Sequence, residues 1–305
     1  MKRFTNQSNG SQAGRMYNGG AKFCRFALFP LMLLMLLLLP AGMVAQKAAS
    51  SSKYIATYES STQTLTFKKF VGETLPSNSV VVKDKMTVAT INKNLGNGTI
   101  VHIVFDKSFS TYTPTSLFCF FKDLTKLETI TGLEYLNTEK VTKMYSMFSS
   151  CSSLTSLDVT HFNTANVTDL SYMFYNCSSL TSLDVTHFNT EKVTDMQGMF
   201  YSCSSLTSLD VTNFNTANVT LMASMFRNCV ALTSLYLTNF NTEKVKSMNS
   251  MFSGCQALTT IYASSKFVTT QVTNSNSSGM FYNCEKLKGE EEWKKTRLPT
   301  RPMPR

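Results

Sequence analysis

Apolar and polar positions recur along this chain with a fixed period of 26 residues. In the unit that starts at Cys177, apolar residues follow at Leu180, Leu183, Val185 and Phe188, with spacings of three, two and three. Nearly identical sequence surrounds cysteines that are each 26 positions apart, namely Cys151, Cys177, Cys203, Cys229 and Cys255. A fixed period of this length indicates a solenoid, in which each unit buries its apolar edge only against its neighbours.

Each unit predicts a short strand followed by a short helix. Residues 182–186 alternate polar and apolar, which indicates a strand with Leu183 and Val185 facing inward. The Asn-Thr pair that follows is typical of a helix cap, and the apolar residues within 193–200 lie at helical spacing. The predicted fold class is therefore an α/β solenoid, a stack of 26-residue rungs that each hold a short strand and a short helix.

Stacked rungs place equivalent side chains about 4.8 Å apart, so the repeat predicts ladders of identical residues. The ladders are Leu154, Leu180, Leu206, Leu232 and Leu258; Phe162, Phe188, Phe214 and Phe240 at a bend; and Phe148, Phe174, Phe200, Phe226, Phe252 and Phe281 at the helix end. Each buried Leu or Phe contributes roughly 1.5–3 kcal/mol. That contribution offsets the ordering of a rung only when its neighbours stack on it.

Glu-Lys and Ala-Asn pairs alternate from unit to unit, as in Glu139-Lys140, Ala165-Asn166 and Glu191-Lys192. One reading is that charged pairs on every second rung keep like charges apart. The other is simple duplication of a two-rung unit, and the residues favour neither.

The chain divides into four predicted segments. Residues 1–45 are predicted to be a signal peptide or an uncleaved anchor, and residues 46–115 a β-rich N-terminal cap region. Residues 116–288 form the leucine-rich solenoid, and residues 289–305 form an atypical tail.

The first segment carries a Leu-rich apolar run at residues 26–45, with basic residues before it and small residues at its end. This pattern is typical of a secretory signal peptide, cleaved after Ala45. The alternative is an uncleaved membrane anchor, which would be the only expected contact with a membrane. In both cases we expect the rest of the chain to leave the cytoplasm.

The cap and the tail depart from the repeat in different ways. Residues 54–58 and 64–67 predict a β-hairpin, and residues 100–105 predict a further strand, which suits a cap over the first rung. Residues 289–305 lack any periodicity and are expected to be disordered. They are either a native end or a truncated or frame-shifted one.

The formal net charge of +10 does not indicate nucleic-acid binding. Residues 1–45 hold five Lys or Arg and no acid, and the last 21 residues hold seven against four Glu. Residues 46–284 hold 17 bases and 15 acids, a net of +2. A nucleic-acid partner requires a basic stripe on the folded face, and the repeats do not supply one.

The cysteines of the repeat are predicted to be reduced residues of the core: Cys151, Cys177, Cys203, Cys229, Cys255 and Cys284. Seven cysteines follow the signal segment, an odd number that argues against full pairing. Parallel Cβ vectors on stacked rungs disfavour disulfides, and a spacing of 26 is not a metal-ligand motif. We expect these thiols to behave as small apolar groups.

Aspartates form a column at Asp158, Asp184 and Asp210, one rung apart. One hypothesis is that calcium bridges the three carboxylates. The favoured interpretation is a solvated strand face without a metal, on which mutual repulsion slightly raises the pKa values of the carboxyl groups.

The outer strand face is the predicted ligand-binding surface, because it is polar, repeated and poor in charge. Aromatic residues at one end are suited to anchor a partner. The face consists of Ser156, Asp158, Thr160, Ser182, Asp184, Thr186, Ser208, Asp210, Thr212, Ser234, Tyr236, Thr238 and Tyr262. The alternative is that this face serves solubility alone.

The repeat unit M-x-x-M-F-x-x-C-x-x-L-T-S-L-D-V-T-x-F-N-T-x-x-V-T-x-M resembles the BspA-like leucine-rich repeat surface proteins of bacteria, over about residues 54–287. Residues 144–167 match it closely, as do the next three units. The resemblance implies a secreted or cell-surface bacterial protein. Some relatives are adhesins for host matrix proteins, and the family carries no catalytic residues or cofactor.

Two functions follow from these observations. The first is an exported adhesin that engages a host extracellular protein or glycan through the strand face. The second is a structural or self-associating component of the surface or matrix, without a discrete ligand. The three histidines, His102, His161 and His187, build no catalytic constellation, so we expect no enzymatic activity.

Overall fold

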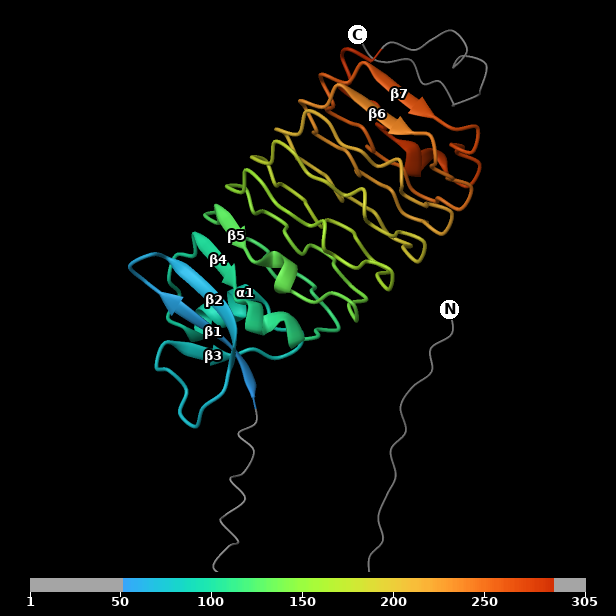
Figure 1. Cartoon of the computed structure of the whole chain (residues 1–305). Coiled ribbons are helices and arrows are strands. Elements are labelled where there is room, and N and C mark those ends of the chain that lie inside the picture. Colours follow the sequence, from blue (N-terminus) through green and yellow to red (C-terminus); the bar gives the residue numbers. More distant parts are fainter. Residues whose placement is uncertain (1–51, 288–305) are drawn as a thin grey trace, which may run out of the picture. The chain divides into compact units, whose positions relative to one another are not determined.

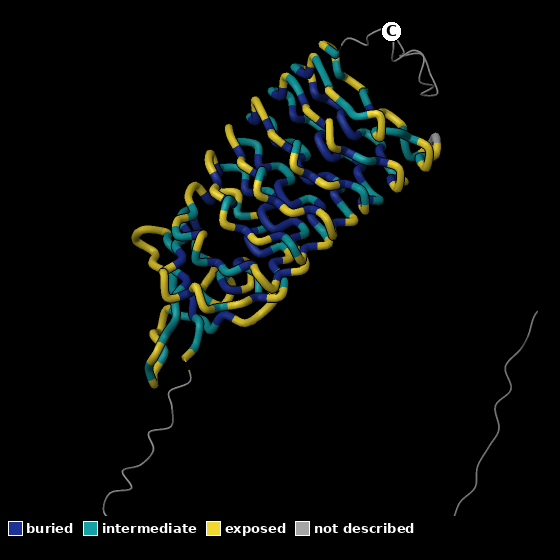
Figure 2. Tube along the Cα trace, turned by 45° about the vertical axis from the view of Figure 1, so that its right-hand side comes forward, coloured by how far each residue is buried: buried dark blue, intermediate teal, exposed yellow. Residues whose placement is uncertain are grey.

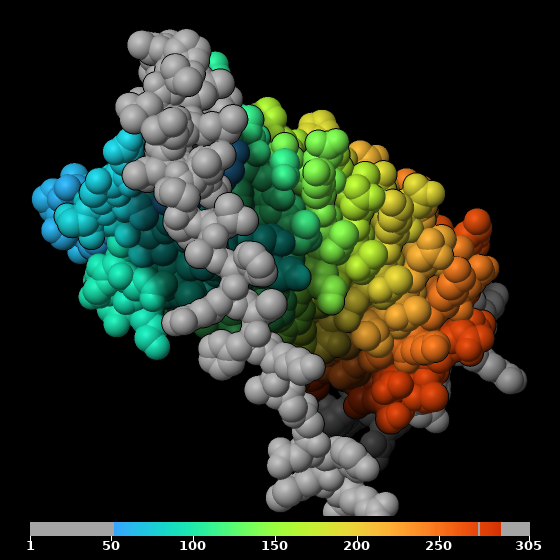
Figure 3. Space-filling model, turned by 90° about the horizontal axis from the view of Figure 1, so that it is seen from below, coloured from blue at the N-terminus to red at the C-terminus, as the bar shows by residue number. Residues whose placement is uncertain are grey.

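In the computed structural model, which describes residues 52–287, the chain winds into a stack of successive rungs (Figure 1). The segments predicted as a signal peptide and as an atypical tail lie outside the described residues. Figure 2 shows buried residues along the inside of the rungs and exposed residues on their outer parts and bends. In Figure 3 the rungs follow one another across the visible surface in sequence order.

A five-stranded sheet begins the stack. β1 (Lys53–Glu59) and β2 (Thr64–Phe70) form the antiparallel hairpin that the sequence predicts, and β3 (Ser79–Val81) joins the free side of β1. β4 (His102–Phe105) pairs with β2, and β5 (Thr129–Thr131) pairs with β4, both in parallel. Since the two last pairings are parallel, the sheet continues from the hairpin into the solenoid.

The helices within residues 52–287 are short. The α-helix of the described residues is α1 (Val88–Asn94), whose first turn is capped by the Thr87 side chain. Three 3-10 helices cover Lys107–Thr111, Leu133–Tyr135 and Asn274–Ser277. Within residues 52–287, no helix combines the length and the hydropathy needed to cross a membrane.

The helix predicted in each rung is wrong, because residues 193–200 form tight turns instead. The Met199 N–H donates to the Met196 carbonyl at 3.3 Å, and the next turn closes between Cys203 and Phe200 at 3.2 Å. Gly198, with φ 58°, occupies the third position of the first of these turns, where a type II turn requires positive φ. A left-handed residue cannot continue an α-helix, so the helical spacing of the apolar residues reflects consecutive turns.

The same left-handed positions recur through the stack. They are Ser146, Tyr172, Gly198, Ser224, Ser250 and Gly279 in the first turn, and Ser150, Asn176, Ser202, Asn228, Gly254 and Asn283 in the second. Most of these residues are Ser, Asn or Gly, and Gly and Asn adopt positive φ at low cost.

These turns carry the backbone hydrogen bonds that join one rung to the next, and we call this row of bonds the turn ladder. The N–H groups of four alternate residues in one rung donate to four carbonyls of the next rung at 2.7–3.1 Å. In the first complete rung the donors are Met144, Ser146, Phe148 and Ser150, and the acceptors are Asp169, Ser171, Met173 and Tyr175. The N–H groups of Met147, Ser149 and Cys151 close the turns, so the N–H groups of the buried residues in this segment are satisfied.

The strand predicted in each rung forms only in the rungs at the two ends of the solenoid, as β5 at its start and as two strands at its far end. At the far end, β6 (Ser234–Leu237) and β7 (Thr260–Ala263) pair in parallel. Residues 182–186, at the equivalent place in an earlier rung, form no strand.

An aspartate side chain accounts for this difference. The Asp184 Oδ1 accepts hydrogen bonds from the Thr186 N–H at 2.9 Å and from the Thr186 hydroxyl at 2.6 Å. An N–H group held by a local side chain is lost to strand pairing. Tyr236 and Tyr262 stand where the earlier rungs have aspartate, and there the strands pair.

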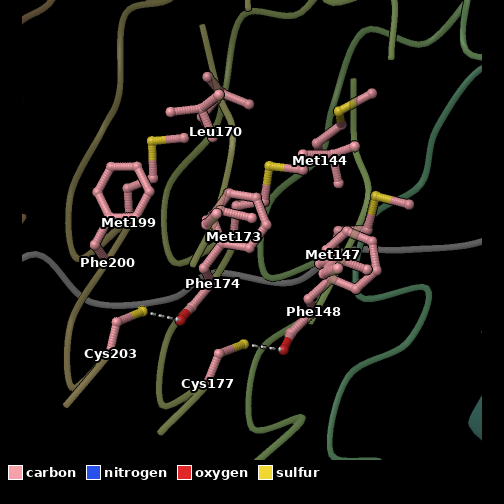
Figure 4. Close-up of a cluster of buried hydrophobic side chains, with 14 of the residues drawn as sticks. Met144, Met147, Phe148, Leu170, Met173, Phe174, Cys177, Met199, Phe200 and Cys203 are labelled. Atoms are coloured by element: carbon pink, nitrogen blue, oxygen red, sulfur yellow. Dashed lines mark hydrogen bonds between the residues drawn. The ribbon is translucent and has the colours of Figure 1, made fainter. Parts of the chain in front are cut away.

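The core is built from stacked side chains, as the repeat predicts. Phe rings at the turn lie parallel to those of neighbouring rungs, with centroids 5.0–5.8 Å apart and interplanar angles of 4–13°. The stack runs through Phe121, Phe148, Phe174, Phe200, Phe226, Phe252 and Phe281, one rung longer than predicted. Buried methionines surround it, including Met147, Met173 and Met199 (Figure 4).

A buried row of threonines adds a polar ladder within the stack. Thr216 is fully buried, and its hydroxyl donates to the Asn241 carbonyl at 2.9 Å and accepts from the Asn241 N–H at 2.8 Å. Thr164 and Thr190 donate in the same way to Asn189 and Asn215. The threonine of each Asn-Thr pair therefore satisfies backbone groups of the next rung.

We expect Thr216→Val to destabilise the protein by about 1–3 kcal/mol, because the isosteric valine leaves the backbone groups of Asn241 without their partner. Urea unfolding measures the effect. Thr220→Val is the matched control, since the Thr220 hydroxyl bonds the Thr194 carbonyl at the surface, and its cost should stay within about 0.5 kcal/mol. Equal losses in both variants would contradict a role for the buried ladder.

Candidate ligand-binding surfaces

The residues of the predicted ligand surface lie on the outside of the rungs, and we call this surface the strand face. Asp158, Asp184 and Asp210 are exposed in successive rungs, and Thr160, Thr186 and Thr212 beside them are half-buried. Of the serines, Ser156, Ser182 and Ser208 are exposed and Ser234 is half-buried, while Thr238 is exposed. The structure therefore brings the predicted set together on one side of the core.

Each aspartate of the strand face is held by the threonine two residues further on. The Thr160 hydroxyl donates to Asp158 at 2.6 Å, and the Thr212 hydroxyl donates to Asp210 at the same distance. These hydroxyl bonds, with help from the threonine N–H groups, lower the pKa of all three aspartates. The expected increase in pKa is therefore wrong, because the hydrogen bonds outweigh the repulsion between neighbouring carboxylates.

The described residues offer little for a metal ion. Within 52–287, no three His, Cys, Asp or Glu side chains gather into a set that could hold one. One oxygen of each aspartate on the strand face is already engaged by its threonine, as in the bonds of Asp184 to Thr186.

Two exposed tyrosines close the strand face at the far end of the stack. The rings of Tyr236 and Tyr262 are parallel within 8°, with centroids 4.6 Å apart. Their exposed fractions are 47% and 46%, although both are large aromatic residues. They form a flat aromatic pair beside columns of small polar side chains.

The cysteines of the repeat lie inside the stack as free thiols. Cys151, Cys177, Cys203, Cys229 and Cys255 are buried, and Cys284 is half-buried. Each thiol donates to a phenylalanine carbonyl of the preceding rung, as Cys177 does to Phe148 at 3.1 Å and Cys203 to Phe174 at 3.1 Å (Figure 4). Burial raises the pKa of Cys177 and of Cys255 to about 12, so these thiols are not reactive nucleophiles.

The alternating Glu-Lys and Ala-Asn pairs contact each other across adjacent rungs. The Lys192 Nζ donates to the Asn166 side-chain oxygen of the preceding rung at 2.8 Å, and the Asn166 amide donates to the Glu139 carbonyl at 3.1 Å. Lys244 and Asn218 repeat the first bond at 2.8 Å. Each lysine therefore meets a neutral amide in the adjacent rung and not a second lysine.

A second surface, which the sequence analysis missed, is a continuous row of aromatic rings on the turn segments. We call it the aromatic row, and it consists of Phe118, Tyr145, Tyr172, Tyr175 and Tyr201, with Arg227 at its end. Consecutive ring centroids lie 4.8–5.8 Å apart, and the Arg227 guanidinium lies 5.4 Å from the centre of the Tyr201 ring. The tyrosines fall at three different positions of the repeat, so no column of identical residues marks them.

The repeats match a known protein family. The family described as "Mycoplasma protein of unknown function, DUF285" matches residues 115–210 and again residues 205–299. The chain belongs to the DUF285 family. The two DUF285 matches together span the rungs of the turn ladder described above.

Comparison with individual proteins adds a distant similarity. A leucine-rich cell surface protein from Faecalibacterium prausnitzii A2-165, of known crystal structure, is 15% identical to this DUF285 protein, with a TM-score of 0.30. The overlap covers 82% of this chain and 97% of the other. A similarity of this extent assigns neither fold nor function. No curated protein matches the chain.

We expect Asp210→Tyr to extend the strand pairing by one rung. The substitution frees the Thr212 N–H from the Asp210 side chain, and residues 208–211 then become able to pair with β6. Hydrogen exchange with mass spectrometry should show amides of 208–212 exchanging at least ~10-fold more slowly, the factor that about 1.4 kcal/mol produces. Asp210→Asn keeps the acceptor and should leave exchange unchanged, so equal protection in both variants would argue against the aspartate as the cause.

We expect the thiols to separate into two reactivity classes. Cys119 and Cys284, which are half-buried, should react with Ellman's reagent in the native protein well before the five buried cysteines. Burial both excludes the reagent and raises the pKa of the buried thiols. In denaturant all of them should react. Rapid reaction of the whole set in the folded protein, or none after unfolding, would contradict the buried reduced ladder.

Proposed function

We propose that this protein is an exported, cell-surface repeat protein that adheres to a host extracellular protein or glycan through the strand face. The stacked pair of Tyr236 and Tyr262 is the observation that carries the proposal. Large aromatic residues that remain exposed beside a polar surface are typical of binding anchors, because they bury much area with little loss of side-chain freedom.

The composition of the strand face supports the same proposal. It presents hydroxyl and carboxylate groups at a repeat of one rung, with the aspartates fixed by their threonines. Fixed hydrogen-bonding groups lose little entropy when a partner binds. A partner with regularly spaced donors, such as a glycan or an extended segment of a matrix protein, fits this arrangement.

Export and surface display rest on the Leu-rich segment at residues 26–45 and on the resemblance of the repeat unit to BspA-like surface proteins. We propose a binding role without catalysis or a cofactor, because the polar groups of the strand face are repeated from rung to rung and make no single reactive cluster.

A second candidate function is a structural component that self-associates end to end. In the last described rung, the N–H groups of Gly279 and Phe281 correspond to the turn-ladder donors of the preceding rung. They make no hydrogen bond within the described part of the chain. Such a row of free donors is suited to pairing with another chain.

Saturable binding of the purified protein to collagen, laminin and mucin tests the adhesin proposal. In the test variant Asp158, Asp184, Asp210 and Tyr236 are replaced by Ala. We expect at least one of the three ligands to bind the wild-type protein and the test variant to lose at least ~10-fold in affinity, as for loss of an anchor residue. The matched control replaces Thr142, Thr168, Thr194 and Tyr282 by Ala, four residues that are also exposed, and should bind normally.

Sedimentation of the same samples separates the two candidate functions. A monomer that binds saturably supports the adhesin. Concentration-dependent oligomers that bind none of the three ligands would favour the structural role.

A further inference from the structure

We propose that the aromatic row is a second binding site, and that it takes a neutral polysaccharide lying along the axis of the stack. This site does not depend on the proposed function, because it uses other residues on another surface. Its rings come from the turn segments, whereas the strand face comes from the segments that follow the cysteines, and both segments bury their apolar side chains in the same core.

The row runs along the stack because its contacts pass from one rung to the next. Phe118 stacks on Tyr145 with centroids 5.2 Å apart and planes within 12°, and Tyr145 contacts Tyr172 at 5.8 Å. Tyr172 contacts Tyr175 of its own rung at 5.8 Å, and Tyr175 contacts Tyr201 at 4.8 Å. A chain-like ligand could therefore touch several rings in succession.

The rungs do not require aromatic residues at these positions. Tyr175 and Tyr201 occupy the place that Ser149 and Ser253 occupy in other rungs, and those rungs form the same turns. The rings also keep part of their surface exposed, with Phe118 at 50%. Since stacking of the backbone does not explain the row, a ligand is the more economical explanation.

The neighbouring rung fixes the Tyr172 ring before any ligand binds. Tyr172, Gly198 and Gln197 lie in neighbouring rungs of the turn ladder, where the Tyr172 N–H donates to the Gln197 carbonyl at 2.8 Å. A Cβ atom at Gly198 would lie 2.6 Å from the Tyr172 ring, so the glycine makes room for it. The Gln197 amide donates to the Tyr172 hydroxyl. A ring held on both sides loses little freedom on binding.

The polar groups beside the rings determine the class of ligand. Asp169 and Asp195 stand in adjacent rungs next to the row, and each commits one oxygen to a neighbouring N–H, leaving the other without a partner in the described residues. Carboxylates accept hydrogen bonds from sugar hydroxyls, and the CH faces of sugars pack on aromatic rings. The same carboxylates repel acidic glycans.

Single-stranded nucleic acid also stacks on aromatic rows, but it needs a basic groove along its backbone. The row offers Arg227 at one end, where the guanidinium already lies over Tyr201. The column beside it holds the exposed Lys143 in the rung before Asp169 and Asp195, so two cations face two carboxylates and form no basic groove. The charge of the surface therefore favours an uncharged chain of sugars.

Affinity electrophoresis in native gels tests the site with dextran, galactomannan and xyloglucan as neutral probes. Polygalacturonate and oligo(dT) are the acidic comparisons. We expect at least one neutral polysaccharide to retard the purified protein and the acidic polymers to leave it unretarded. In the variant Tyr175→Ser with Tyr201→Ser, the apparent Kd should rise at least ~10-fold, as for loss of ring contacts at a binding hot spot.

Two further variants keep the outcome interpretable. Gly198→Ser introduces the residue that Ser224 and Ser250 provide at the same backbone position, so the rung should fold while the Tyr172 ring is displaced and retardation weakens. Tyr236→Ala with Tyr262→Ala removes the aromatic pair of the strand face and should leave retardation intact. Protection of the buried cysteines from Ellman's reagent reports that each variant is folded.

The proposal is overturned if no neutral polysaccharide retards the folded protein, or if the Tyr175 and Tyr201 variant is retarded as strongly as wild type. Stronger retardation by polygalacturonate or oligo(dT) would also overturn it. Loss of retardation in the Tyr236 and Tyr262 variant alone would assign glycan binding to the strand face instead.

Discussion

The turn ladder is the interaction on which the rest of this structure depends. Four backbone N–H groups of one rung donate to four carbonyls of the next, and the left-handed residues between them let the chain turn twice within eight positions. This arrangement pairs the buried polar backbone without a helix or a regular strand. It also sets the distance between rungs, so the Phe rings stack with centroids 5.4–5.8 Å apart from Phe148 to Phe281. The same register between rungs also aligns the buried cysteines and the buried threonines of the stack.

Because the turn ladder pairs the backbone groups on one side of each rung, the side chains elsewhere on the rung can vary. On the strand face the backbone need not pair, and Asp184 can hold Thr186 locally without loss of the stack. On the turn side, one position of the rung accepts serine, tyrosine or arginine, as at Ser149, Tyr175 and Arg227, without a change in the turns. Folding therefore does not determine the side chains on either surface, as is usual for the binding surfaces of repeat proteins.

The periodic residues predicted most of the architecture. The 26-residue period, the inward Leu and Phe columns, the buried cysteines and the first hairpin follow from the pattern of apolar positions. The helix could not be predicted correctly, because a run of two turns places Met196, Met199 and Phe200 at the same spacing as a helix does. The strand was wrong where a side chain competes for an N–H, a contact that alternation of polar and apolar residues does not reveal. The aromatic row could not be predicted, because its residues differ between units and contact one another only when the rungs stack.

The hydrogen bond between Lys192 and Asn166 constrains how many repeat units can be inserted or removed. Each rung offers donors on one side and acceptors on the other, so an inserted copy of 26 residues meets the backbone partners that its neighbours meet. An insertion of one unit, however, places two lysines or two asparagines in adjacent rungs. Only an insertion of an even number of units, 52 residues at the least, preserves both the backbone ladder and the lysine–amide contacts. Recombination within the gene would thus extend or shorten the molecule most easily in double steps, altering its reach while the ends stay the same.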